Sequence, residues 1–350
     1  MSYELTQGAM VALSVAVGVL FLLTLLLTAY SVVLRIAYER RERLWTRLVA
    51  SWEAPVLAAL TDPAAVEAVH ATVPDRYRLY FVNFILDYSQ RVRGDELETL
   101  RTLAEPYLEE IAKRARHRGA EVRLRSVQTL GALGLPRYES EVVAALDDPS
   151  RSVAIVALRA LADARYSAHA QALLDHVGRF DGWEPSFLGS MLAEVGPVVS
   201  EALREGLADA SRPAWLRTVF AIALRIQLEP RAADVAVAVL PDVDDLDLRI
   251  ELLRLLREVG RPDHVSAVLP LTRSGEFAVR AYAMQVLGVI GDEAIVGTLR
   301  AGLDDPSPWV SARAAGALLA VGGKKLVTDL AAREPRYRAL IGQVLGMEGA

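Results

Sequence analysis

The sequence contains no cysteine among its 350 residues, and this absence excludes several kinds of protein. Without thiols the chain can form no disulfide, no thiolate metal site and no cysteine nucleophile, and it suits a reducing compartment. Aromatic residues are also few, at 7%, and alternating runs of β-branched residues are absent, whereas Ala, Leu, Val and Arg dominate. Because this composition favours helices, we expect an all-α protein.

A second absence is that of charge near the N-terminus, where no charged residue lies between Glu4 and Arg35. As a helix, the apolar run 8–34 would be about 40 Å long. That length exceeds the roughly 30 Å hydrocarbon core of a bilayer, so the run can span it with some tilt. A cleaved signal peptide would need a basic start and a shorter apolar core. We therefore expect residues 1–34 to hold an uncleaved, single-pass transmembrane helix.

Arginines follow the apolar run at once, and they predict its orientation. Segments rich in Arg and Lys stay on the cytoplasmic side because their transfer across a bilayer is costly. We expect the inner (cytoplasmic) membrane, with the N-terminus outside and a cytoplasmic C-terminal body. The arginines that carry this prediction are Arg35, Arg40, Arg41, Arg43 and Arg47.

Residues 35–119 are expected to form a helical stalk and the cap helices that begin the body. The stalk should continue the membrane helix to about Pro55, since no helix breaker precedes it. The segment 75–93 then carries an aromatic stripe at helical spacing. This stripe is either a docking face for a membrane partner or the bilayer surface, or a core face packed on its neighbours. Its candidate partner-binding residues are Tyr77, Tyr80, Phe84 and Tyr88.

Basic residues gather at the end of the next predicted helix. They are either stabilised there by the helix macrodipole, or they form a surface for anionic lipid or an acidic partner. The whole chain has a net charge of −5, which argues against nucleic acid as a partner. The candidate basic patch consists of Lys113, Arg114, Arg116, Arg118, Arg123 and Arg125.

From residue 120 to residue 350 the chain repeats itself. An apolar helical segment recurs with its second residue at 123, 154, 217, 249, 280 and 311, and a degenerate copy at 185–196 fills the double gap. About seven units of 31–32 residues result, each with a shorter second helix. Glycines are expected to close most of the first helices as C-caps, namely Gly134, Gly196, Gly260, Gly291 and Gly322. One unit cannot bury both faces of its apolar helix, so we expect stacked helix pairs in an α-solenoid.

Two identical turns, Asp-Asp-Pro-Ser at 147–150 and at 304–307, separate units. Val-Arg pairs at 122–123 and 279–280 open the first helices that precede these turns. Together with the terminal Leu-Gly or Ile-Gly, these features resemble HEAT repeats, specifically the short HEAT-like units also found in phycobilin lyases. The resemblance implies a superhelix of helix pairs. It says little about chemistry, because such arrays act as scaffolds far more often than as catalysts.

With its N-terminal anchor, the chain is also similar to a group of bacterial membrane-anchored HEAT-repeat proteins encoded beside processive membrane glycosyltransferases. The matching residues are 83–94 in the aromatic helix, together with Trp45 and Trp52 in the stalk. This resemblance implies a setting in envelope or polysaccharide synthesis, with an integral membrane protein such as a glycosyltransferase as the partner.

Four arginines share one repeat position, and stacking would align them in a ladder. They either pair with acidic residues of adjacent turns, such as Asp148 and Asp245, or they contact a partner. The members of this ladder are Arg123, Arg217, Arg249 and Arg280.

Other residues have a structural and a functional interpretation. The acidic run 242–247 suggests calcium, but it lacks the Gly and the closing Glu of an EF-hand loop, so helix capping is favoured. His169 and His176 could share a helix face, but no third metal ligand is visible. Trp183 and Trp309 are either exposed anchors for a partner or packed between units.

No nucleophile elbow, phosphate-binding glycine loop or His-Glu-x-x-His motif occurs, and we expect neither an enzyme nor a cofactor. The favoured function is a membrane-tethered scaffold that binds a protein partner. The alternatives are a self-assembling or lipid-surface structural protein, which would include a homo-oligomer, and a lyase-like or isomerase-like enzyme.

Overall fold

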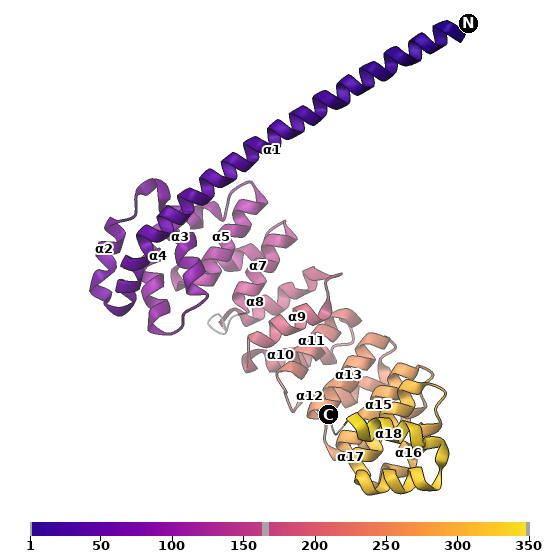
Figure 1. Ribbon diagram of the computed structural model, residues 1–350. Coiled ribbons are helices and arrows are strands. Elements are labelled where there is room, and N and C mark those ends of the chain that lie inside the picture. The colour runs from indigo at the N-terminus through magenta and orange to yellow at the C-terminus, as the bar shows by residue number, and fades with distance from the viewer. Residues whose placement is uncertain (1, 163–167, 348–350) are drawn as a thin grey trace. The chain divides into compact units, whose positions relative to one another are not determined.

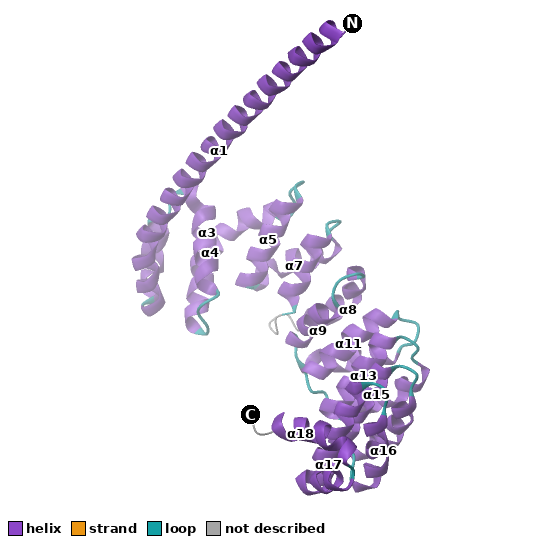
Figure 2. Ribbon diagram, turned by 45° about the vertical axis from the view of Figure 1, so that its right-hand side comes forward, coloured by secondary structure: helices purple, strands orange, loops and turns teal. Residues whose placement is uncertain are grey.

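The computed structural model describes residues 2–162 and 168–347, with side chains from residue 18 onward apart from residues 63 and 347. The described residues form helices and no strand, which confirms the all-α class (Figure 2). The chain divides into two compact units, Met1–Ile111 and Ala112–Ala350.

The first unit is organised around one long helix. Helix α1 (Ser2–Thr61) is unbroken, and it is followed by α2 (Val66–Ala71), α3 (Arg78–Ser89) and α4 (Asp95–Arg114) (Figure 1). The side chains of residues 18–34 are all exposed. The helix from Gly18 to Thr61, which contains these residues, is by length and composition able to cross a membrane.

Helix α1 continues beyond Pro55, so the prediction that the stalk ends there was wrong. A proline inside a helix costs roughly 3 kcal/mol, because it removes a hydrogen bond and crowds the preceding turn. Here the side chains of Trp52, Val56 and Ala59 on both sides of the proline are fully buried. A buried Trp or Val contributes about 1.5–3 kcal/mol, so packing of this face outweighs the cost.

The second unit is a stack of helix pairs. The first helices of successive pairs are α5 (Ala120–Leu133), α7 (Arg151–Leu161), α9 (Pro185–Glu194), α11 (Ala214–Ile226), α13 (Leu246–Val259), α15 (Phe277–Ile290) and α17 (Pro308–Arg333). The shorter helices that alternate with them or follow are α6 (Glu139–Ala144), α8 (Ala170–Val177), α10 (Ser200–Ala208), α12 (Ala232–Val239), α14 (Val265–Val268), α16 (Val296–Ala301) and α18 (Arg338–Met347).

First helices pack against one another from α9 through α11, α13 and α15 to α17, and α5 packs against α7 (Figures 1 and 2). Glycines permit the closest approaches. A Cβ atom on Gly288 of α15 would lie 2.7 Å from the Cα atom of Ala317 in α17. At the equivalent repeat position, a Cβ atom on Gly131 would lie 2.3 Å from that of Ala160. The same contact between helices therefore recurs five units apart.

The glycines at the ends of first helices serve two different purposes. Gly134 has a φ of 62° and closes α5 in the left-handed conformation. Gly260 and Gly291 have extended backbone instead, and a Cβ atom there would lie 2.2 Å from the carbonyl oxygen of Leu256 or 2.6 Å from that of Leu287. The predicted stop at Gly322 lies one residue early, because the break inside α17 is at Gly323, whose φ is 70°.

Candidate protein-binding surface

The aromatic stripe on α3 is largely used within the first unit. Phe84 is 1% exposed, and its ring lies 5.9 Å from that of Trp52 in α1, while Phe81 meets Trp52 edge-on at 5.2 Å. Aromatic pairs at these separations add about 0.5–1.5 kcal/mol beyond their burial. Phe81 and Phe84 therefore hold α3 against the C-terminal part of α1.

The three tyrosines of the stripe are half-buried. Tyr80 lies 6.2 Å from Trp45 of α1 and 6.1 Å from Tyr77, measured between ring centroids. The hydroxyl of Tyr88 donates a hydrogen bond of 2.9 Å to Glu53 Oε1. Burial and the Glu53 carboxylate raise the pKa of Tyr88. The tyrosines thus also tie α3 to α1, and only part of each ring remains accessible.

The candidate basic patch separates into an exposed cluster and one inward-facing arginine. Arg123 lies apart from the others, because its Nε and Nη2 atoms donate to the two carboxylate oxygens of Asp148 at 2.7 and 2.8 Å. Its Nη1 atom donates to the carbonyl oxygens of His117 and Arg118 at 2.9 and 3.1 Å. The exposed members are Lys113, Arg114, Arg116, Arg118 and Arg125, of which Arg125 pairs with Glu121.

Of the other members of the arginine ladder, one pairs with an aspartate as Arg123 does, and two do not. Arg280 forms a bidentate pair with Asp305, but Arg217 donates to the carbonyl oxygen of Leu207 at 2.9 Å and Arg249 to that of Val243. Asp245 does not pair with the ladder. Its side chain caps α13 by accepting a hydrogen bond of 2.9 Å from the Leu248 amide, as the capping interpretation of this acidic run predicts.

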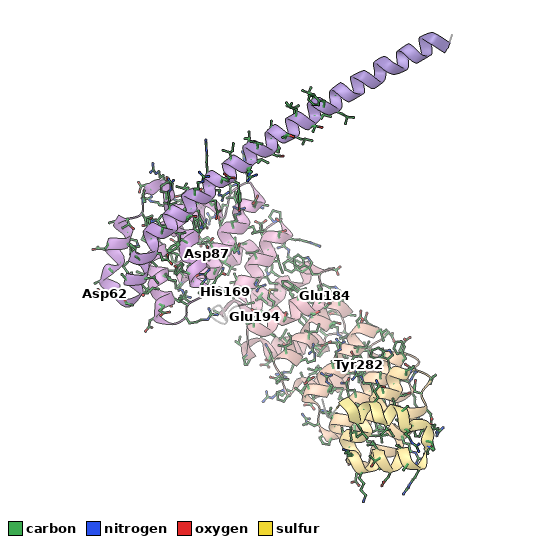
Figure 3. All side chains as sticks on the ribbon, viewed as in Figure 1. Asp62, Asp87, His169, Glu184, Glu194 and Tyr282 are labelled. Atoms are coloured by element: carbon green, nitrogen blue, oxygen red, sulfur yellow. The ribbon has the colours of Figure 1, made fainter. Side chains whose placement is uncertain are left out.

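The two histidines contact different carboxylates rather than each other. His169 Nε2 lies 2.9 Å from Glu139 Oε1, and His176 Nε2 lies 3.1 Å from Asp147 Oδ1 (Figure 3 labels His169). Each pair connects one helix pair with the next, since its members lie about 30 residues apart in the sequence. Their role in this structure is to link repeats.

The two tryptophans differ in their surroundings. Trp183 is half-buried, between Phe180 at 5.8 Å and Phe187 at 6.0 Å. Trp309, in the first turn of α17, is 66% exposed. A large aromatic side chain held this openly on a packed helix is unusual, and such residues often mark binding surfaces.

Two grooves meet at Trp309. One has a volume of about 610 Å³ and runs toward the turn before α17, past Asp304, Arg336 and Tyr337. The other has a volume of about 480 Å³ and lies between α15, α17 and α18, where Gln285, Arg313 and Gln343 line it. Both volumes fall in the range of about 300–1,000 Å³ that is common for binding sites. We refer to Trp309 and these two grooves as the Trp309 surface.

The Trp309 surface also contains two notable polar side chains. Arg313 is exposed, one turn after Trp309 on the same helix. The Oε1 atom of Gln285 is buried and has no hydrogen-bond partner among the described residues. Trp and Arg are the residue types that contribute most at protein interfaces. Sequence reasoning overlooked Arg313 and Gln285; the spacing of four residues between Trp309 and Arg313 is the signal that could have drawn attention to Arg313.

An equivalent groove occurs near the other end of the stack. It has a volume of about 560 Å³ and is lined by α5, α7 and Glu194 of α9, with Gln128 and Arg159 among its polar residues. Gln128 and Gly131 occupy the same repeat positions as Gln285 and Gly288 of the Trp309 surface. The groove between successive first helices thus recurs with the repeat, whereas, among the described residues, the exposed tryptophan occurs only at the groove of the last repeat.

Comparison with known proteins supports the fold. The family model described as HEAT repeats matches residues 265–345. With the repeated helix pairs described above, this identifies the array as a HEAT-like α-solenoid, a fold typical of protein-interaction scaffolds. A direct comparison with characterised proteins gives no match.

Several solved structures are similar at low sequence identity. The crystal structure of Kap121p is 14% identical with a TM-score of 0.47, over 78% of this chain and 36% of that one. The chain therefore spans about a third of the Kap121p structures that it matches. Human deoxyhypusine hydroxylase in complex with glycerol is 19% identical with a TM-score of 0.32, over 79% of this chain and 98% of that one. A designed armadillo repeat protein is 17% identical with a TM-score of 0.32, over 68% and 99% of the two chains.

Proposed function

We propose that this protein is a membrane-tethered scaffold, in which α1 anchors the chain and the solenoid binds a protein partner through the Trp309 surface. The observation that carries the proposal is the 66% exposure of Trp309 between two grooves, the highest among the described aromatic side chains of the array. The scaffold has no catalytic role in this proposal.

The tether rests on the exposed apolar part of α1. Residues 18–34 are all exposed, and leaving so many apolar side chains in water would be strongly unfavourable. The arginines that follow favour a cytoplasmic body and an outside N-terminus. Tethering raises the effective concentration of a partner in the same membrane without adding any contact.

The partner we favour is an integral membrane protein of envelope or polysaccharide synthesis, such as a glycosyltransferase. Its support is the similarity of residues 83–94 and of the stalk to membrane-anchored HEAT-repeat proteins of that setting. In the structure, Trp52 contacts Phe84 of the matching segment, and Trp45 contacts Tyr80 earlier in the same helix.

The test is purification of the full chain from membranes in mild detergent, with quantification of proteins that co-purify at stoichiometric amounts. The double variant W309A/R313A should lose most of the partner, whereas V198A, at a residue that is 59% exposed elsewhere in the solenoid, should retain it. Recovery of lipid without any stoichiometric protein would reject the scaffold. Digestion of the body by a protease added outside intact cells would reject the orientation.

A second candidate function is that of a structural protein at a lipid surface. It is favoured by the exposed cluster Lys113, Arg114, Arg116, Arg118 and Arg125, since cationic side chains are attracted to anionic headgroups. Flotation of a form lacking residues 1–34, which keeps the packing of Trp45 and Trp52 on α3, with and without anionic lipid in the vesicles, separates the two functions. Binding only to anionic vesicles supports this second candidate.

A further inference from the structure

The first turns of five successive first helices carry large apolar side chains. Trp309, Phe277 and Leu246 are 66%, 52% and 38% exposed, Phe187 is 36% exposed, and Trp215 is half-buried. We call this row the apolar edge. Its members are Phe187 of α9, Trp215 of α11, Leu246 of α13, Phe277 of α15 and Trp309 of α17.

Repetition brings these residues to one side of the stack. The first helices run in the same direction, because each pair returns the chain through its second helix, and α9 to α17 pack consecutively. Their N-terminal turns therefore lie along one edge. With helix axes about 8–10 Å apart, the four steps from α9 to α17 cover about 35 Å. At the repeat position of Leu246 and Phe277, α5 and α7 carry Ala120 and Arg151. At the next position, that of Trp215 and Trp309, they carry Glu121 and Ser152, so the apolar edge begins at α9.

Exposed carboxylates accompany the apolar edge. They lie in the turns that precede α9, α13 and α15 or in the first turn of α13, and none of them forms an ion pair within the described ranges. Glu184, directly before α9, is one of them (Figure 3). The full set is Asp181, Glu184, Asp242, Asp244, Asp247 and Glu276.

Few cations balance these carboxylates. Among the turns of this edge, Arg212 is paired with Asp209, and Arg179 donates to the carbonyl oxygens of Leu146 and Asp148. Arg273 is exposed and forms no ion pair among the described residues. Of the cations beside the edge, Arg280 is attracted to Glu276 but pairs with Asp305, and Arg151 of α7 donates to the carbonyl oxygen of Asp181 at 3.5 Å. The edge thus combines apolar contact area with an excess of negative charge.

The apolar side chains and the negative charge together limit which molecules can bind to the apolar edge. An anionic bilayer surface would be repelled by the carboxylates. The same edge of a second copy would place like charges opposite each other, which is unfavourable. A segment that presents apolar side chains together with Lys or Arg is complementary in both respects.

We infer that the apolar edge is the docking site for a basic, amphipathic segment of the partner protein, about 35 Å long if it follows the whole row. This inference rests on the proposed scaffold function and names the chemistry of the partner. It extends the Trp309 surface from the last repeat across the four preceding ones.

A pair of peptides tests the charge preference directly. The full chain in nanodiscs of phosphatidylcholine is titrated with two labelled synthetic amphipathic helices of 18 residues, which share a leucine face and carry either lysines or glutamates on the other face. Fluorescence anisotropy gives the dissociation constants, with empty nanodiscs as the baseline. The lysine peptide should bind, and its affinity should fall as salt is added.

Variants locate the contact. The double variant L246S/F277S should weaken binding of the lysine peptide by about tenfold or more. D242N/D244N should weaken it less and reduce its salt dependence, and V198S should leave it unchanged. Equal affinity for both peptides, no binding of the lysine peptide, or insensitivity to L246S/F277S would each overturn the inference.

Cross-linking in cells separates this inference from the proposed function. A photoreactive amino acid placed at Phe277 should cross-link to a Lys- or Arg-rich segment of the co-purifying partner, and one at Val198 should not. If a stoichiometric partner is recovered but Phe277 does not reach it, the inference fails and the scaffold stands. A cross-link to residues 35–47 of a second copy would show self-assembly and overturn it, and absence of any partner removes both proposals.

Discussion

Arg280 donates two hydrogen bonds to the carboxylate of Asp305, from Nε to Oδ2 at 2.7 Å and from Nη2 to Oδ1 at 3.0 Å. The same arrangement joins Arg123 to Asp148, five repeats earlier. In each pair the arginine belongs to the start of one first helix, and the aspartate to the turn before the next. The Asp Oδ1 atom also accepts a hydrogen bond of 2.8 Å from the amide two residues later, that of Ser307 or Ser150. The pair therefore fixes the start of one repeat to the start of the following one.

Breaking this pair should destabilise the solenoid. Both side chains of the Arg280–Asp305 pair are largely buried, at 15% and 11% exposure, so R280M would leave the carboxylate without its main partner. We expect a loss of about 2–3 kcal/mol in the free energy of unfolding, measured with urea. R125M removes the exposed pair with Glu121 and should cost less than about 0.5 kcal/mol. Equal effects of the two variants would contradict this role.

The same pairs should make the solenoid sensitive to acid. The hydrogen bonds from Arg123 and Arg280 lower the pKa of Asp148 and of Asp305, respectively, below the ordinary value. A carboxyl whose folded pKa is depressed binds fewer protons when folded than when unfolded, so its stabilisation is present above the unfolded pKa and is lost as the pH falls through the folded one.

We therefore expect the free energy of unfolding to fall as the pH drops below about 4, the ordinary range for Asp. The double variant D148N/D305N should be less stable at neutral pH and should lose less of its stability on acidification. Urea unfolding at a series of pH values measures both effects. A double variant that follows the wild-type pH profile would contradict the assignment.

Leu228 occupies a position better suited to glycine. Its φ is 52°, and it lies two residues after the end of α11, where Glu229 N donates to Leu224 O at 3.1 Å. The left-handed conformation costs a side-chain-bearing residue roughly 1–2 kcal/mol, and the Leu228 side chain is 58% exposed, so little packing offsets that cost. L228G should stabilise the chain by about 0.5–1 kcal/mol in thermal or urea unfolding. The control is G260A. Gly260 already has a negative φ, so alanine causes no backbone strain there, but its Cβ atom would lie 2.2 Å from the carbonyl oxygen of Leu256, and the variant should be less stable.

Close helix contact at Gly288 predicts a large effect of one methyl group. G288A would place its Cβ atom 2.7 Å from both the Cα and the Cβ atoms of Ala317, so α15 and α17 must separate, at a cost of about 1–3 kcal/mol. Gly316, in the interior of α17, has no atom within 4 Å of the equivalent position. G316A should instead stabilise by about 0.5–1 kcal/mol, because alanine favours the helix. The two variants thus predict opposite shifts of the melting temperature.

Much of the architecture follows from the sequence because its signals are local or periodic. The apolar run 8–34 and the repeat of 31–32 residues predict one long apolar helix and an α-solenoid, and the Asp-Asp-Pro-Ser turns locate two of the boundaries. The pairing of Arg123 with Asp148 follows from the same periodicity, since a repeated turn places a repeated carboxylate near a repeated arginine.

Side-chain exposure could not be predicted in this way. Phe84 and Trp309 are both large aromatics near predicted helices, yet one is 1% and the other 66% exposed. Phe84 is covered by Trp52, which is distant in the sequence, whereas the neighbours of Trp309 on α18 leave grooves instead of covering it. The passage of α1 through Pro55 likewise depends on burial of the flanking residues.

The sequence alone determined the type of element, the repeat length and the segment able to span a bilayer, because helix formation and hydrophobic burial depend on residues close together in the chain. Only the tertiary structure decided which aromatic residues are covered, where the grooves open and which carboxylates stay without an ion pair. Those outcomes depend on how separate helices pack, and packing joins residues that the sequence keeps far apart.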